Sequence, residues 1–118
     1  MPLRSYKDLT VWKKSVDLVA EVYKVTSRLP RSERFGLASQ MQRAAVSIPA
    51  NIAEGYHRTH RAEYRQFLSI SYGSGAELET HLEVCRRIPD YAAIDLRPAG
   101  AALDEVMRML NTMRAHLG

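Results

Sequence analysis

A cluster of basic side chains lies in the middle of the chain. Arg58, Arg61 and Arg65 are spaced three and four residues apart, so a helix would place all three on one face. Guanidinium groups pair with phosphate oxygens through charge-assisted hydrogen bonds, which are often bidentate. His57 and His60 lie beside the arginines, and a single carboxylate opposes them. The spacing therefore predicts a phosphate-binding surface, with these three arginines as the first candidates for contact with nucleic acid.

Aromatic rings accompany the cluster, because Tyr56 and Tyr64 flank it. Bases can stack on such rings while the phosphates pair with the arginines. The further candidates for the same surface are Arg43, Lys13 and Lys14, with Lys7 and Arg4 before them. The alternative interpretation is an ordinary solvated surface, on which the same cations form ion pairs between subunits with the acidic residues of the 77–83 segment.

Metal-binding and catalytic arrangements are not expected. Glu54 and His57 have the Glu-x-x-His spacing of di-iron bundles, but such a site needs a second pair, and no other histidine follows a glutamate by three residues. Cys85 falls on an apolar helix face, where a thiol is usually inert. The sequence thus predicts no metal, no cofactor and no enzymatic activity. RNA cleavage by two histidines, His57 and His60, is the remaining enzymatic alternative.

Four segments with helical periodicity must position these residues. Their expected ranges are residues 8–28, 33–55, 59–88 and 95–118. Ser32 is the expected N-cap of the second segment, with Glu33 in its first turn, and Pro98 is tolerable in the first turn of the fourth. No segment alternates like a strand. Because the connections are short, consecutive helices should run antiparallel, which predicts an all-α, up-down four-helix bundle in one domain over residues 1–118.

The first segment carries more apolar surface than a bundle core can cover. One apolar seam consists of Val11, Leu18, Val22, Val25 and Leu29, and a second consists of Trp12, Val16, Val19 and Tyr23. A helix on one side of a monomeric bundle needs only one apolar stripe, somewhat over 100° wide. One seam should therefore face the core and the other a second subunit, which predicts a homo-oligomer.

The second segment combines small residues with a mixed polar stripe. Its core seam is Leu37, Met41, Ala45, Ile48 and Ile52, and its polar stripe is Gln40, Arg43, Ser47, Asn51 and Glu54. Amides and hydroxyls on such a stripe indicate a crowded, partly buried interface in which each group has a defined partner. Pro49 cannot donate a backbone hydrogen bond and is expected to bend the helix.

In the third segment, Gly73 and Gly75 indicate close approach of a neighbouring backbone.

The composition sets the broad class of protein. The 118 residues are 46% hydrophobic and 25% charged, which is typical of a soluble globular domain and leaves no stretch for a membrane span. A single cysteine and the absence of an apolar leader favour the cytoplasm. Residues 1–66 carry twelve basic and six acidic side chains, whereas residues 67–118 carry five and seven. This asymmetry suits an acidic partner such as nucleic acid.

A series of short motifs runs along most of the chain. It comprises residues 6–12, Leu29-Pro30 and residues 33–37, 40–49, 51–55, 63–68 and 73–80, and the most specific member is Asn51-Ile52-Ala53-Glu54-Gly55. In this order the motifs resemble those of the bacterial four-helix bundle proteins encoded in intervening sequences of 23S ribosomal RNA genes. The last helix resembles that family only as an amphipathic pattern.

The resemblance implies a homopentameric barrel of four-helix bundles, in agreement with the two apolar seams of the first helix. A related group, the accessory variability determinants of diversity-generating retroelements, forms a similar basic barrel that binds a reverse transcriptase and its template RNA. Five copies of the arginine cluster would strengthen a weak phosphate contact through avidity. The leading hypothesis is a non-enzymatic homo-oligomer whose basic surface contacts RNA or an RNA-handling protein. The alternative is an adaptor for a reverse transcriptase that does not itself touch nucleic acid.

Overall fold

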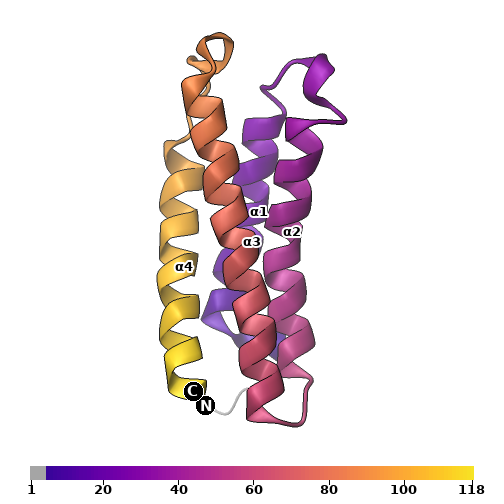
Figure 1. The fold of residues 1–118 in the computed structure, drawn as a ribbon, viewed down its shortest axis with the longest axis vertical. Helices are drawn as coiled ribbons and strands as arrows, with labels where there is room; N and C mark the ends of the chain where they lie inside the picture. The colour runs from indigo at the N-terminus through magenta and orange to yellow at the C-terminus, as the bar shows by residue number, and fades with distance from the viewer. Residues whose placement is uncertain (1–4) are drawn as a thin grey trace.

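The computed structural model describes residues 5–118, and this part of the chain folds into helices without any β-strand (Figure 1). The four long helices are α1 (Thr10–Thr26), α2 (Leu37–Tyr56), α3 (Arg61–Arg87) and α4 (Arg97–Leu117). Short 3-10 helices, η1 (Tyr6–Asp8), η2 (Arg31–Glu33) and η3 (Pro89–Tyr91), precede α1, α2 and α4. The α1–α2 and α3–α4 connections lie at one end of the molecule, and the α2–α3 connection and the C-terminus at the other (Figure 1). This all-helical, four-helix architecture agrees with the predicted bundle.

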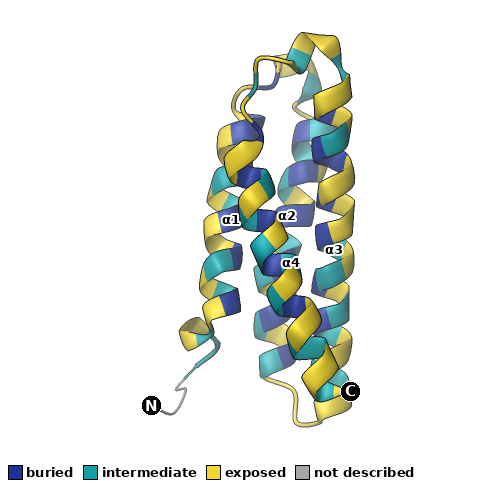
Figure 2. Cartoon of the chain, turned by 90° about the vertical axis from the view of Figure 1, so that its left-hand side faces the viewer, coloured by how far each residue is buried: buried dark blue, intermediate teal, exposed yellow. Residues whose placement is uncertain are grey.

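The core is built from one apolar face of each helix, and Figure 2 shows the buried residues turned inward between the helices. Its largest fully buried side chains include Leu18 and Val22 of α1, Met41, Ile48 and Ile52 of α2, Leu68 and Leu78 of α3, and Leu103, Val106 and Leu110 of α4. On α1, the seam that begins at Val11 faces this core, as one of the two seams was expected to do. No described helix is long and apolar enough to cross a membrane.

The start of α2 differs from the sequence prediction. The helix begins at Leu37 with Gly36 at the N-cap position, whereas Ser32 lies within η2. The side chain of Glu33 supplies the missing cap, because its Oε1 accepts a hydrogen bond from the Leu37 N–H at 3.3 Å. Its Oε2 accepts a second hydrogen bond, from the Tyr91 hydroxyl at 2.6 Å. One carboxylate therefore ties the α1–α2 connection to the α3–α4 connection.

The pKa of the Tyr91 hydroxyl is expected to lie well above that of an ordinary tyrosine. The hydrogen bond to the Glu33 carboxylate, together with burial and nearby negative charge, raises the pKa of Tyr91 to about 12. The protonated phenol is the donor, so its contribution to stability is complete below the ordinary tyrosine pKa of about 10. That contribution is lost as the pH rises through the folded-state pKa.

A titration of phenolate absorbance, read while the helical circular dichroism remains native, should show a component near this raised pKa. Tyr91→Phe should remove that component, and Glu33→Gln should move it towards lower pH. A Tyr91→Phe curve that keeps the high-pH component would contradict the assignment.

Polar contacts join α2 to α3 beside the proline. Pro49 lies inside α2, which continues to Tyr56. The Ser71 hydroxyl of α3 donates to the carbonyl oxygen of Ile48 at 2.9 Å, in the buried interior. The hydroxyls of Ser47 and Ser74 are 2.8 Å apart and share a hydrogen bond. Ser47 of the α2 polar stripe thus has a partner on α3, whereas Arg43 of the same stripe makes no hydrogen bond, so the prediction for the whole stripe is only partly confirmed.

The glycines of α2 and α3 have different surroundings. A Cβ on Gly75 would collide with the Sδ of Met107 on α4, so a neighbour does approach there, although it is a flexible side chain. Gly73 is exposed, and nothing lies within 4 Å of the position a Cβ would take, so the prediction of close approach is wrong at that residue. Gly55 is buried in the last turn of α2, where a Cβ would lie only 2.8 Å from the Cβ of Phe67.

Candidate nucleic-acid interface

Arg58 lies in the α2–α3 connection, outside both helices. Because α3 begins at Arg61, the predicted single helix face does not hold all three arginines of the cluster. The Arg58 guanidinium donates to Oε1 of Glu54 at 2.6 Å and lies 4.8 Å from the centre of the Phe67 ring. An exposed ion pair of this kind adds little to stability. The side chain remains exposed to solvent, where a phosphate could reach it.

Arg61 and Arg65, in the first turns of α3, reach across to the last turn of α4. Arg61 Nη2 donates to the carbonyl oxygen of His116 at 2.6 Å, and Arg65 Nε donates to that of Arg114 at 3.1 Å. The last carbonyls of a helix carry partial negative charge, so both arginines stabilise the end of α4. The Arg114 carbonyl also accepts a hydrogen bond from the Gly118 N–H at 3.1 Å. A guanidinium has five N–H donors, and each of these contacts uses one. The two residues therefore combine a structural role with donors left for a ligand.

α4 adds a fourth arginine at this end of the molecule. Arg114 Nε donates to the Ser69 hydroxyl at 3.0 Å, and its guanidinium lies 4.5 Å from the centre of the Tyr72 ring. Arg114 was not predicted as a site residue, although the expected up-down bundle would place the last turn of its fourth helix beside the first turn of its third. We call the group formed by Arg58, Arg61, Arg65 and Arg114 the arginine end. In the sequence, His57, His60 and His116 are close to these arginines, as are the carboxylates of Glu54 and Glu63.

The second-choice candidates lie elsewhere. Lys14 pairs with Glu105 of α4 at 2.9 Å, and Lys13 is exposed on α1. Arg43 is exposed in a groove between α2 and α3 that is lined by Gln40, Ala44, Ser47, Ser74 and Glu77. The position of Arg43 along α2 places it roughly 20 Å from Arg58. Arg4 lies outside the described residues.

A comparison with protein families decides the identity of the chain. The model of the family described as 23S rRNA-intervening sequence protein matches residues 7–112, which include α1 to α3 and most of α4. The chain belongs to this family. The match confirms the resemblance inferred from the motifs, whereas the relation to the retroelement determinants remains a hypothesis from the sequence. A comparison with curated proteins finds no match.

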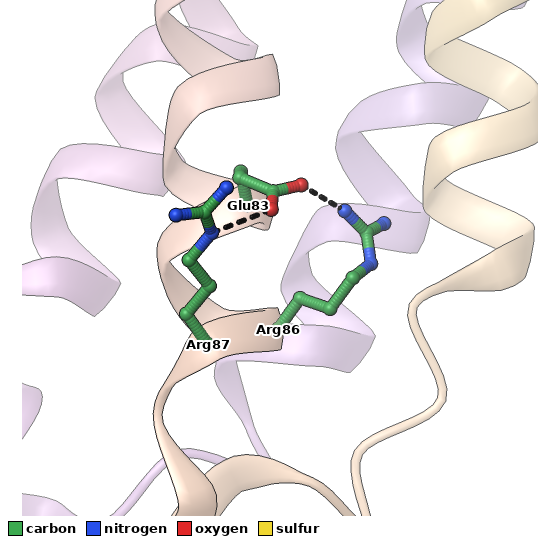
Figure 3. Close-up of polar contacts among 3 residues, drawn as sticks. All are labelled: Glu83, Arg86 and Arg87. Atoms are coloured by element: carbon green, nitrogen blue, oxygen red, sulfur yellow. Dashed lines mark hydrogen bonds and ion pairs between the residues drawn. The ribbon is translucent and has the colours of Figure 1, made fainter.

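In this member of the 23S rRNA-intervening sequence family, the arginines on either side of the α3–α4 connection are paired with carboxylates. Arg87 Nε donates to Glu83 Oε2 at 2.9 Å, and Arg86 pairs with the other carboxylate oxygen (Figure 3). The hydrogen bonds from Arg87 and Arg86 lower the pKa of Glu83. Arg97, which follows the α3–α4 connection, pairs with Asp95 at 3.0 Å. Glu83 belongs to the acidic segment that was expected to form ion pairs between subunits. It pairs instead with Arg86 and Arg87 of its own helix.

The groups considered for metal binding or catalysis make other contacts in residues 5–118. No three His, Cys, Asp or Glu side chains gather there as a metal site. Glu54 is paired with Arg58, and the His57 ring lies edge-on to the Tyr6 and Tyr56 rings, with centres 5.5 and 5.8 Å away. The Glu-x-x-His pair is therefore occupied by other contacts.

Two titratable side chains of α3 are buried. The Cys85 thiol is fully buried with its Sγ 3.9 Å from the Sδ of Met41, and burial raises its pKa. His81 is buried as well, its Nδ1 has no hydrogen-bond partner, and burial lowers its pKa. Burial of this kind favours the neutral form of both groups, so each packs as a neutral side chain at neutral pH.

Proposed function

We propose that this member of the 23S rRNA-intervening sequence family is a non-enzymatic homo-oligomer of antiparallel, up-down four-helix bundles whose basic surface contacts RNA or an RNA-handling protein. The observation that supports RNA contact most directly is the arginine end, where four arginines gather and only Arg58 is paired with a carboxylate, that of Glu54. The Tyr56 and Tyr64 rings, with centres 6.4 Å apart, lie at the same end. Arginines beside aromatic rings suit phosphate pairing combined with base stacking.

The proposed contact depends on charge rather than on base sequence. Phosphate contacts by arginine position a nucleic acid without reading its bases. Arg61 and Arg65 are held in place by the carbonyl groups of α4, which reduces the side-chain entropy lost when a phosphate binds. Because every neutralised phosphate releases counterions, binding should weaken steeply as the salt concentration rises.

Assembly is supported by a row of large apolar side chains at the surface. Val16 and Tyr23 of the second α1 seam are 39% and 46% exposed, and Val46 of α2 is 44% exposed. Tyr23 and Val46 line one shallow groove between α1 and α2. Exposed apolar patches of this kind mark interaction surfaces. We propose that a second copy covers this exposed apolar row (Val16, Tyr23, Val46), in a pentameric barrel that carries five arginine ends.

The RNA contact is tested by replacing Arg58, Arg61 and Arg65 together with alanine. We expect binding of a short structured RNA at low salt to weaken by at least about tenfold, and the slope of log K against log salt to fall by about 2. Fluorescence anisotropy across a salt series measures both quantities. Arg108→Ala is the matched control, because Arg108 forms an exposed ion pair with Asp104, four residues away, as Arg58 does with Glu54.

Because Arg61 and Arg65 also contact the end of α4, their loss could weaken the fold as well as RNA binding. Replacing Arg58, Arg61 and Arg65 together with lysine distinguishes the loss of positive charge from the loss of these structural contacts. Lysine retains the positive charge for phosphate and should preserve most of the binding. An intact wild-type oligomer that binds no RNA at low salt would contradict the proposal. That result would favour the adaptor function, for which the exposed apolar row supplies a protein-binding surface.

A further inference from the structure

Phe35 is the most exposed of the large apolar side chains in the described chain, with 87% of its surface accessible. It lies in the α1–α2 connection, residues 27–36, where hydrogen bonds within the backbone hold the chain on both sides of it. The Glu33 N–H donates to Pro30 at 2.9 Å, and the Gly36 N–H donates to Glu33 at 3.0 Å. A ring held outward in this way adds nothing to the core. A single exposed apolar residue is common, so its meaning depends on its neighbours.

The connection that holds Phe35 also carries arginines whose guanidinium groups make no hydrogen bond or ion pair. Among residues 5–118, the arginines whose guanidinium makes no hydrogen bond or ion pair are Arg28, Arg31, Arg34 and Arg43, and the first three lie in this connection. The Arg34 guanidinium lies 5.2 Å from the centre of the Phe35 ring. In contrast to the arginine end, these cations keep all their donors for a ligand.

The one acidic residue of the connection does not neutralise these arginines. Glu33 gives one oxygen to the Leu37 N–H and the other to the Tyr91 hydroxyl. Its carboxylate is therefore occupied with holding the connection against α2 and η3. The outer surface of the connection therefore keeps the positive charges of Arg31 and Arg34, and Arg34 lies over the exposed aromatic ring. Arg28 lines a separate pocket with Glu21 and Asp95.

We propose that the α1–α2 connection binds single-stranded RNA, with an unpaired base stacked on Phe35 and the flanking phosphates paired with Arg31 and Arg34. Proteins that hold single strands combine positive charge along the backbone with aromatic rings under the bases. A duplex buries its base faces and offers no partner for the ring. This inference rests on the proposed RNA contact and names the class of RNA, at a site distinct from the arginine end.

The test compares two labelled RNAs in fluorescence anisotropy, an unstructured oligouridine and a duplex of equal length, with the full-length protein. Phe35→Ala should weaken binding of the single strand by at least about fivefold and leave binding of the duplex nearly unchanged. Phe35→Trp should retain single-strand binding, whereas Phe35→Leu, which keeps apolar bulk without a π face, should behave like alanine.

Charge at the site is tested separately by Arg31→Ala combined with Arg34→Ala. The salt slope for the single strand should fall by about 1.4, because each phosphate contact on a single strand contributes about 0.7. Phe35→Ala should leave that slope unchanged. Arg87→Ala is the control at the same end of the molecule, since Arg87 is already paired with Glu83.

The outcomes distinguish this site from the broader function. Wild-type RNA binding that survives Phe35→Ala but is lost in the Arg58, Arg61 and Arg65 triple variant would overturn the site and leave the proposed function standing. A wild-type protein that binds neither RNA overturns both. A changed assembly mass for Phe35→Ala in light scattering would identify the ring as a subunit contact and overturn the site. Because the ring is exposed, all Phe35 variants should melt at the wild-type temperature.

Discussion

Gly55→Ala is expected to lower the free energy of unfolding by about 1–3 kcal/mol, the usual cost of overpacking a close contact. A Cβ at this position would lie 2.8 Å from the Cβ of Phe67 and 3.3 Å from the carbonyl oxygen of Tyr64. Both atoms belong to or adjoin the backbone of α3, so no rotamer change can move them. The last turn of α2 would have to separate from α3. This penalty exceeds the gain of about 0.5–1 kcal/mol that alanine normally brings to a helix interior.

Gly73→Ala is the matched control for this substitution. Gly73 is also inside a helix, but the position of its Cβ is open, so only the gain in helix propensity applies. Chemical denaturation followed by circular dichroism should show Gly73→Ala more stable than the wild type by up to about 1 kcal/mol and Gly55→Ala less stable. Equal effects of the two substitutions would show that the α2–α3 contact does not require glycine.

The second large effect is expected for Val46→Glu, which should dissociate the proposed oligomer into single chains. A carboxylate buried at a subunit interface without a partner costs several kcal/mol. Val46 is 44% exposed in the single chain, so the fold itself should tolerate the charge. Light scattering after size exclusion measures the mass of the assembly, and a thermal melt confirms that the separated chains remain folded.

Val84→Glu provides the control for assembly. Val84 is 41% exposed, similar to Val46, but it lies on α3, whereas the exposed apolar row lies on α1 and α2. The Val84→Glu variant should therefore keep the wild-type mass. Dissociation by Val84→Glu alone would place the interface on α3 and refute the proposed role of the exposed apolar row.

The helices and the inward faces could be predicted from the sequence because both follow from local periodicity. Leu18, Val22, Met41, Ile48 and Ile52 recur at helical spacing, and all are fully buried. Periodicity could not assign the two seams of α1, because both have the same spacing and only the position of the neighbouring helices selects one for the core.

Features that depend on contacts distant in sequence could not be predicted. Ser32 was the cap predicted from the sequence, but Glu33 takes this role, and its carboxylate is also bonded to Tyr91, 58 residues away. The three arginines of the predicted cluster recur at helical spacing, which is visible in the sequence. The carbonyl groups that Arg61 and Arg65 contact lie 55 and 49 residues further along the chain, which the sequence does not show. The residue types alone indicated a basic surface. Which N–H donors of Arg61 and Arg65 remain free for a phosphate depends on where α4 ends, because its last carbonyls accept from both side chains.

The buried position of Cys85 makes this side chain an intrinsic reporter of transient opening. It is the only cysteine of the chain and lies against Met41 in the core, so it can meet an alkylating reagent only when the helices that bury it move apart. Under conditions in which closing is faster than alkylation, the labelling rate measures the equilibrium of that opening, in the native protein and without any introduced probe. An opening free energy from labelling that is smaller than the free energy of global unfolding would identify local opening of the core around Cys85.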